Sequence, residues 1–282
     1  MLTALLLFSS TFALEASMSL GKRYVAQRRE TVLEMCFLGL TWGLILLLVT
    51  LAFGADFRVT VASLPTLALR IILEAALIFV LAEATVKADR TTMAFLRLLT
   101  IPLLLVVDVT LGYHFSALQL AGVGLMFFAL MLAFRHNPRG RRGAHLAVLS
   151  AILAVGTISL YKYNITHFNS VVGEQTVGLT VLLVVFYVMS ARKGRSPLRL
   201  LTQSTTGTQS LANGVSIALE SFAMALAPAA IVITLKRSFA VVWAIIFGGT
   251  YFHEHSLGRK MASGGLLSLS LVMIASPQIF RI

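Results

Sequence analysis

The stretch VITLKRSFAVVWAI, residues 232–245, places a lysine and an arginine side by side in a long apolar segment. A charged side chain at the centre of a bilayer costs about 2.5–3.5 kcal/mol, so such residues normally face an opposite charge or a hydrated cavity. Apolar residues make up 58% of the 282 positions and charged residues 12%, whereas soluble domains carry roughly 25% charged residues. The sequence therefore predicts an all-α integral membrane protein.

Apolar segments of roughly 20 residues, the length of a membrane-spanning helix, recur along the chain between short polar joints. We expect ten transmembrane helices, at 2–20, 31–53, 66–86, 91–113, 117–134, 144–163, 174–191, 207–226, 228–252 and 257–276. Sixteen of the 23 Lys and Arg residues fall in the joints after the odd-numbered helices, and three fall on the opposite side. We expect a multi-pass protein of the plasma (bacterial inner) membrane, and the positive-inside rule predicts that both termini lie outside the cytoplasm.

The two halves of the chain align when one is shifted by 140 residues without a gap. The matched positions include charged residues and glycine, which coincide by chance less readily than leucine. They are Glu34 with Glu174, Arg97 with Arg237 and Gly124 with Gly264. With five helices in each half, the halves must have opposite orientations. We expect two inverted five-helix repeats around a central cavity, at 1–134 and 144–282, joined by a basic cytoplasmic linker at 135–143.

Two predicted helical hairpins carry charges at matching depth. In the hairpin that turns near 227–228, Glu220 lies within one turn of Lys236 and Arg237, which predicts an ion pair. In the hairpin that turns near 88–89, Glu83 and Arg97 are placed in the same way. One interpretation makes the two pairs, Glu83 with Arg97 and Glu220 with Lys236, alternating gates of a transport cycle. The alternative is a structural salt bridge in each hairpin.

The segment 207–226 carries a polar stripe at helical spacing, which in lipid must face protein or water. We expect a substrate site formed by this stripe, the neighbouring cations and two aromatic residues. Its predicted members are Gln209, Asn213, Ser216, Glu220, Lys236, Arg237, Tyr161 and Trp243.

Glu15 is a carboxylate inside the first apolar segment. Desolvation favours the protonated form of such a group, which suits a proton-coupling site. The alternative is an ion pair with one of the membrane arginines. Arg70 and Glu74 are four residues apart on one predicted helix and are expected to satisfy each other.

The run LKRSFAVVWAIIFGGTYFHE, residues 235–254, resembles the ninth helix of EamA-type members of the drug/metabolite transporter superfamily. The following run LGRKMASGGLLSLSLVMIAS resembles the tenth helix of that family, and Glu15 with Lys22 is similar to the first helix of small multidrug resistance proteins. The resemblance implies a ten-helix inverted repeat with a cavity lined by helices 1, 3, 4, 6, 8 and 9. It also implies secondary export or exchange of small metabolites.

Three functions remain open on the sequence. The first is secondary active transport of a small metabolite with an anionic group, bound at Lys236 and Arg237. The others are proton-coupled export of cationic or amphipathic compounds through Glu15, and lipid or polyprenyl-phosphate flipping. No nucleophile–base pair, nucleotide-binding motif or multi-cysteine cluster occurs in the sequence. We therefore expect no enzymatic activity, cofactor, metal or nucleic-acid partner, and a monomer or homodimer in the bilayer.

Overall fold

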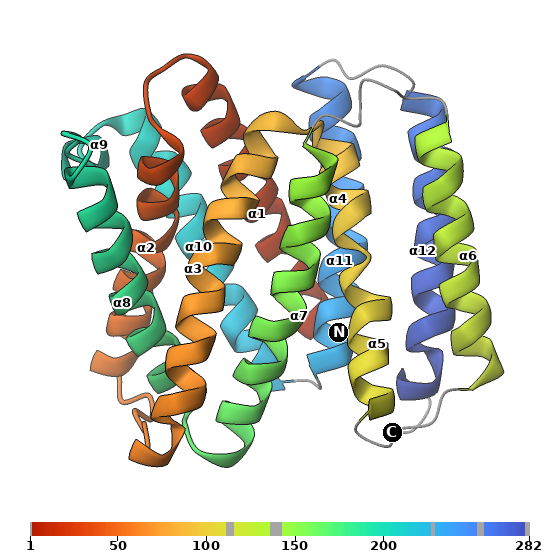
Figure 1. Ribbon diagram of the computed structural model, residues 1–282, viewed down its shortest axis with the longest axis horizontal. Coiled ribbons are helices and arrows are strands. Elements are labelled where there is room, and N and C mark those ends of the chain that lie inside the picture. Colours follow the sequence, from red (N-terminus) through yellow and green to blue (C-terminus); the bar gives the residue numbers. More distant parts are fainter. Residues whose placement is uncertain (1, 111–115, 136–142, 227–228, 253–256, 280–282) are drawn as a thin grey trace.

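The chain folds as a bundle of long helices. A computed structural model describes residues 2–110, 116–135, 143–226, 229–252 and 257–279, and every regular element within these ranges is a helix (Figure 1). The elements are α1 (Leu2–Ala26), α2 (Val32–Ala52), η1 (Val61–Ser63), α3 (Leu64–Lys87), α4 (Arg90–Arg97), α5 (Thr100–Thr110), α6 (Ala117–Arg135), α7 (Ala144–His167), α8 (Val171–Ala191), α9 (Leu198–Leu201), α10 (Ser204–Leu226), α11 (Ala229–Thr250) and α12 (Leu257–Ile279).

Local chemistry sets where individual helices begin. Thr31 and Glu34 form a capping box at the start of α2, in which each side chain accepts a hydrogen bond from the other's backbone N–H. Ser170 caps α8 by accepting from the backbone N–H of Gly173 at 3.1 Å. Each cap satisfies backbone donors that the first turn of a helix leaves without an intrahelical partner.

The predicted helix at 91–113 is interrupted in the structure. Helix α4 ends at Arg97 and α5 begins at Thr100; residues 111–113 of that prediction lie outside the described residues. The cause is Pro102, which has no backbone N–H to donate to the carbonyl of Leu98 and whose ring crowds that carbonyl. The backbone N–H of Ile101 bonds to this carbonyl instead, at 2.9 Å.

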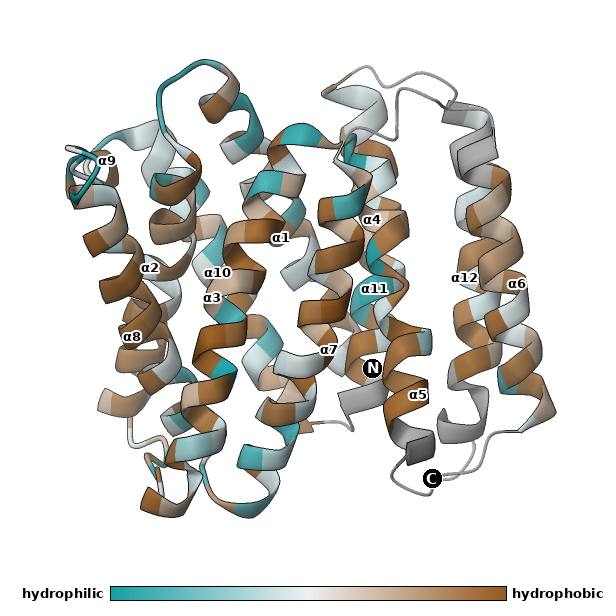
Figure 2. Cartoon of the chain, in the orientation of Figure 1, coloured by the Kyte–Doolittle hydropathy of each residue, from teal (hydrophilic) through white to brown (hydrophobic). Residues whose placement is uncertain are grey.

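Among the described residues, seven helical segments are long and apolar enough to cross a membrane: Leu2–Ala26, Val32–Ala52, Val61–Lys87, Arg90–Val107, Ala144–His167, Val171–Ala191 and Val232–Thr250. Two shorter apolar segments lie at Ala117–Leu132 and Met261–Ile274. Apolar residues predominate along the middle of many helices in Figure 2, and large apolar side chains such as Ile72 and Val184 are exposed on the outside. Such a surface fits a protein embedded in lipid.

The helices pack in matching pairs. Helix α1 packs against α10 and α11, and α7 packs against α3 and α4. The two largest buried apolar clusters lie in different parts of the bundle. One joins α4, α5, α6, α11 and α12 around Leu98, Met126 and Leu267, and the other joins α2, α3 and α8 around Leu40 and Leu182. These clusters flank the polar interior described below.

The two ends of the bundle differ in charge. In Figure 1, α1 begins and α12 ends toward the lower edge of the view, and the joints after α1, α3 and α8 lie toward the upper edge. The joints at the upper end carry Arg28, Arg29, Arg192, Lys193 and Arg195, all of which are exposed. Basic residues of the described chain therefore gather at one end of the bundle.

Candidate functional site: a cationic cavity within the bundle

A cavity of about 280 Å³ lies among the helices. It is lined by side chains of α1, α2, α3, α4, α7, α8, α10 and α11, whereas α6 and α12 contribute none of its described lining residues. The family resemblance implies a cavity lined by the predicted helices 1, 3, 4, 6, 8 and 9, which correspond to α1, α3, α4, α7, α10 and α11. All six line the observed cavity, together with α2 and α8. Most of the wall is apolar, with polar and charged side chains from α1, α3, α4, α7, α8, α10 and α11. A cavity of this kind, apolar with a few polar groups, is typical of small-molecule sites.

The charged residues that line the cavity are mostly basic. Five are cations and two are carboxylates: Arg70, Arg97, Lys162, Lys236, Arg237, Glu74 and Glu220. The lining therefore carries an excess of three positive formal charges. In a low-dielectric interior, such an excess attracts an anion far more strongly than it would in water.

The ion pair predicted for the hairpin of α10 and α11 is present in the structure. Lys236 Nζ lies 2.5 Å from Glu220 Oε1, and both side chains are mostly buried. Arg237 follows directly on α11 and is 6% exposed. Its buried Nε has no hydrogen-bond partner, and Arg237 forms no ion pair with a carboxylate of the described chain. Of the two adjacent cations, Lys236 is the one that is neutralised.

The predicted ion pair between Glu83 and Arg97 is wrong. Glu83 pairs with Lys87, one turn away on α3, with 2.5 Å between Lys87 Nζ and Glu83 Oε2. The reason is the helical repeat, which places side chains four residues apart on the same face. Arg97 instead lines the cavity, and its Nε is buried without a partner. Arg97 therefore remains a candidate site residue, but Glu83 cannot form the gate ion pair with it that the sequence suggested.

The polar stripe of α10 faces the cavity as expected. Gln209, Asn213, Ser216 and Glu220 all line it. Some of their polar atoms also bind neighbouring helices: Asn213 donates to the carbonyl of Gly39 on α2, and Ser216 Oγ lies 3.1 Å from Ser10 Oγ on α1. The stripe therefore both holds α10 in the bundle and presents polar atoms to the cavity.

The two predicted aromatic residues have different positions. Tyr161 lines the cavity, and its ring lies 4.6 Å from the Arg70 guanidinium in a cation–π contact. Trp243 does not belong to the described lining. Its ring packs against Phe8 and Phe12 of α1, and its Nε1 donates to the carbonyl of Phe8 at 3.3 Å. The prediction for Trp243 is corrected, because its face of α11 is turned to α1 rather than inward.

Glu15 is paired. Its carboxylate accepts a hydrogen bond from Arg90 at the start of α4, and both side chains are almost fully buried. Of the two interpretations that the sequence left open, the structure shows an ion pair, but its partner is an arginine of the joint between the predicted helices 66–86 and 91–113 and not one of the arginines inside a predicted helix. Glu15 is also absent from the described cavity lining, whereas Leu14 and Ser17 on either side of it belong to that lining.

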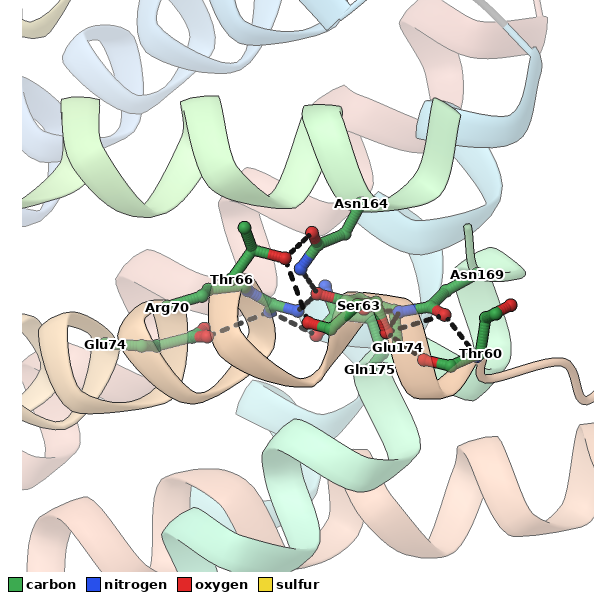
Figure 3. Close-up of polar contacts among 9 residues, drawn as sticks. All are labelled: Thr60, Ser63, Thr66, Arg70, Glu74, Asn164, Asn169, Glu174 and Gln175. Atoms are coloured by element: carbon green, nitrogen blue, oxygen red, sulfur yellow. Dashed lines mark hydrogen bonds and ion pairs between the residues drawn. The ribbon is translucent and has the colours of Figure 1, made fainter. Parts of the chain in front are cut away.

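A hydrogen-bonded network joins side chains of α3, α7 and α8 (Figure 3). Arg70 on α3 bonds Glu74 at 2.8 Å, as expected, and also Glu174 on α8 at 3.0 Å. Glu174 is fully buried and accepts further hydrogen bonds from Asn164 and Asn169. The network ties α3, α7 and α8 together, which gives a buried charge the partners it requires.

The sequence did not predict the roles of two buried glutamates. Glu174 was recognised only as the repeat equivalent of Glu34, and Glu30 in the joint between α1 and α2 was not singled out. Glu30 is 2% exposed and accepts a hydrogen bond from Gln209 at 3.1 Å. No spacing rule could have found this contact, since it joins residues 179 positions apart.

Comparison with known proteins gives no assignment by similarity. No protein-family model matches the sequence, and no curated protein matches it. The function must therefore be argued from the chemistry of the cavity.

Proposed function

We propose that the chain is a secondary active transporter that moves a small metabolite bearing an anionic group across the membrane by alternating access. The observation that carries this proposal is the cavity inside an apolar helix bundle whose lining has five cations and two carboxylates. Arg97 and Arg237 are the residues we assign to the anionic group. An arginine guanidinium binds carboxylate or phosphate through paired hydrogen bonds, and these two lack a carboxylate partner in the described chain.

The packing of the bundle supports the inverted-repeat part of this proposal. The contacts of α1 with α10 and α11 correspond to those of α7 with α3 and α4, as a two-fold relation between the halves requires. Glu34 and Glu174, which the 140-residue shift aligns, lie in the first turns of α2 and α8. These helices begin at opposite ends of the bundle in Figure 1. We therefore propose ten spans, formed by the seven apolar segments together with α6, α10 and α12.

The resemblance of residues 235–254 to EamA-type transporters suggests that the chain belongs to that family. We also assign the upper end of the bundle in Figure 1 to the cytoplasm. The basic joints at that end support this orientation through the positive-inside rule. The exposed Lys162 lines the cavity toward the opposite end. We assign the conformation described here to a state that is accessible from outside.

Anionic cargo is favoured over cationic cargo by the partners of the carboxylates. The alternative of cation export depended on a free Glu15, and this residue is paired with Arg90. Glu74 and Glu220, the two carboxylates of the cavity lining, are paired with Arg70 and Lys236. A cation entering the cavity would meet no unpaired carboxylate among the described lining residues.

The experiment is a thermal-shift screen of the purified full-length protein with small carboxylates, inorganic phosphate, organic cations and a lysophospholipid. We expect an anion to raise the melting temperature in a concentration-dependent manner. The shift should be lost in Arg237→Gln and Arg97→Gln and kept in Arg199→Gln, which changes an exposed arginine outside the cavity. A shift caused by cations alone, or an anion shift that survives both cavity substitutions, would overturn the proposal. A shift caused by the lysophospholipid alone would favour lipid flipping.

A further inference from the structure

Glu30 is a buried carboxyl group with too few hydrogen-bond donors for a charged state. It lies in the joint between α1 and α2 and is 2% exposed. Its Oε1 accepts one hydrogen bond, from Gln209 Nε2 at 3.1 Å, and its Oε2 is buried with no partner. Glu30 forms no ion pair with a basic side chain of the described chain. A buried carboxylate normally has a cation or several donors to stabilise its charge.

The side-chain amide of Gln209, which binds Glu30, also has a buried acceptor without a donor. Gln209 Oε1 is also buried without a hydrogen-bond partner. Both unpartnered atoms are acceptors while Glu30 is ionised, so they cannot satisfy each other. A proton on Glu30 Oε2 would supply the missing donor. With a small rotation, the O–H of Glu30 would donate to Gln209 Oε1 while Gln209 Nε2 donates to Glu30 Oε1, which closes a ring of two hydrogen bonds.

The surroundings of Glu30 also favour the proton. Burial and the negative charge of Glu34 raise the pKa of Glu30 to about 8, although the hydrogen bond from Gln209 acts in the opposite direction. Glu34 is itself paired with Arg195 at 3.3 Å. Arg28 and Arg29 in the same joint are exposed to solvent. Gln209 of α10 bonds to Glu30, and Cys36 of α2, whose buried thiol is close enough to interact electrostatically with Glu30, also belongs to its surroundings.

Gln209 connects this carboxyl group to the cavity. Its side chain lines the cavity, and its backbone carbonyl accepts a hydrogen bond from Ser17 of α1 at 2.8 Å. Gly21 of α1 leaves room for the amide: a Cβ at this position would lie 2.8 Å from Gln209 Nε2. Any change in how Gln209 bonds to Glu30 therefore acts on the contact between α1 and α10 at the wall of the site.

We propose that Glu30 is a proton-binding site and that Gln209 couples its protonation to the transport cavity. This inference rests on the proposed transport function and names its coupling ion. Protonated Glu30 holds the joint between α1 and α2 against α10 through its hydrogen bonds with Gln209. When the proton leaves, the ionised carboxylate requires water, which favours a conformation in which this end of the bundle opens to solvent. Glu30 thus has the role that the sequence assigned to Glu15.

The first test measures protonation directly and needs no substrate. Infrared difference spectroscopy of the purified full-length protein should show a protonated carboxyl band that disappears as the pH rises through about 8. The band should be missing in Glu30→Gln and unchanged in Asp56→Asn, a control at an exposed joint. In Glu34→Gln, which can keep the capping box because glutamine serves there as well, the band should disappear at a lower pH. A band that persists in Glu30→Gln, or one that disappears near pH 4.5, would overturn the proposal.

The second test uses thermal stability against pH. Because the pKa of Glu30 in the folded protein is above its usual 4.5, the folded state binds the proton more tightly than the unfolded state. The stabilisation is therefore complete below about pH 4.5 and is lost as the pH rises through about 8. Glu30→Gln supplies a permanent donor to Gln209 and should flatten this dependence, with a higher melting temperature than the wild type at pH 9. An equally steep dependence in Glu30→Gln would contradict the assignment.

The third test addresses coupling. Proteoliposomes with an imposed pH gradient would be assayed with the anion that gives the thermal shift above. We expect the gradient to drive accumulation in the wild type and in Asp56→Asn, and Glu30→Gln to lose gradient-driven accumulation while keeping the thermal shift. Gradient-driven accumulation in Glu30→Gln would overturn the coupling role. If no anion binds at all, the proposed function fails, and the infrared titration still decides whether Glu30 holds the proton.

Discussion

Lys236 and Arg237 are adjacent in the chain, yet their side chains have different partners. Successive residues on a helix point in directions about 100° apart, because a turn takes 3.6 residues. Lys236 points to Glu220 across the hairpin, whereas Arg237 is turned into the cavity wall without a carboxylate partner in the described chain. One cation therefore pairs with a carboxylate across the hairpin, and the other has no carboxylate partner in the described chain.

Replacing Lys236 by methionine should destabilise the protein. The substitution leaves the Glu220 carboxylate mostly buried without its cation, and we expect a loss of about 1–3 kcal/mol in the free energy of unfolding. Thermal unfolding of the purified protein, followed by tryptophan fluorescence, would measure the change. The double variant Lys236→Met with Glu220→Gln removes both charges and should recover most of the stability. Equal losses in the single and double variants would contradict an ion pair as the cause.

At the scale of elements, α10 is the helix that most of the site depends on. One face carries the polar residues of the cavity, and another approaches α2 closely through glycine. At Gly214, a Cβ would lie 2.6 Å from the backbone carbon of Trp42 and 2.8 Å from the backbone nitrogen of Gly43. The neighbouring groups include backbone atoms, which cannot rotate away as a flexible side chain can. The position of the polar stripe relative to the cavity thus depends on the absence of a side chain at this crossing.

Gly214→Ala should separate α2 from α10 and lower stability by about 1–3 kcal/mol, the usual effect of overpacking. Gly265→Ala on α12 is the matched control, since a Cβ there meets no atom within 4 Å. The control should be neutral or stabilising by up to about 1 kcal/mol, because alanine is the better helix former. Melting temperatures of the two variants against the wild type provide the comparison. A Gly214→Ala protein as stable as the Gly265→Ala protein would refute the close crossing.

At the scale of the whole molecule, the distribution of basic residues and the apolar outer surface support the proposed orientation in a membrane. Exposed cations of the described chain gather at the end that holds the joints after α1, α3 and α8, whereas the joint between α2 and η1, to which Arg58 belongs, lies at the other end. By the positive-inside rule, and because anionic lipid headgroups of the cytoplasmic leaflet attract basic residues, this asymmetry favours a cytoplasmic position for the basic end. In the proposed orientation, the joint between α1 and α2 that holds Glu30 lies at the cytoplasmic end.

Cysteine labelling of intact cells would test this orientation. A membrane-impermeant thiol reagent should label Arg58→Cys in intact cells and Lys193→Cys only after permeabilisation, because the two exposed residues lie at opposite ends of the bundle. The wild type is the control, since its single cysteine, Cys36, is buried and 3% exposed. The opposite labelling pattern would invert the assignment of the two faces.

The sequence could predict much of the local structure of this protein. Hydropathy and length gave helices close to those observed, such as Val32–Ala52 for the prediction 31–53 and Ala144–His167 for 144–163. The ion pair of Glu220 with Lys236 was also predictable. It joins residues 16 positions apart across one hairpin, and the fixed rise of a helix sets their depth. The break at Leu98–Leu99 could have been found from Pro102, although the apolar run concealed it.

The charged contacts between distant segments were decided by the tertiary structure alone. Glu15 meets Arg90, Arg70 meets Glu174, and Glu30 meets Gln209 only because helices far apart in the sequence pack side by side. The physical reason is that composition and periodicity fix which residues must avoid lipid, whereas the partner of each buried charge depends on which helix faces come together. The sequence by itself thus determined a membrane-embedded helical protein with charges inside it. Packing determined which of those charges have an oppositely charged partner and which do not within the described chain.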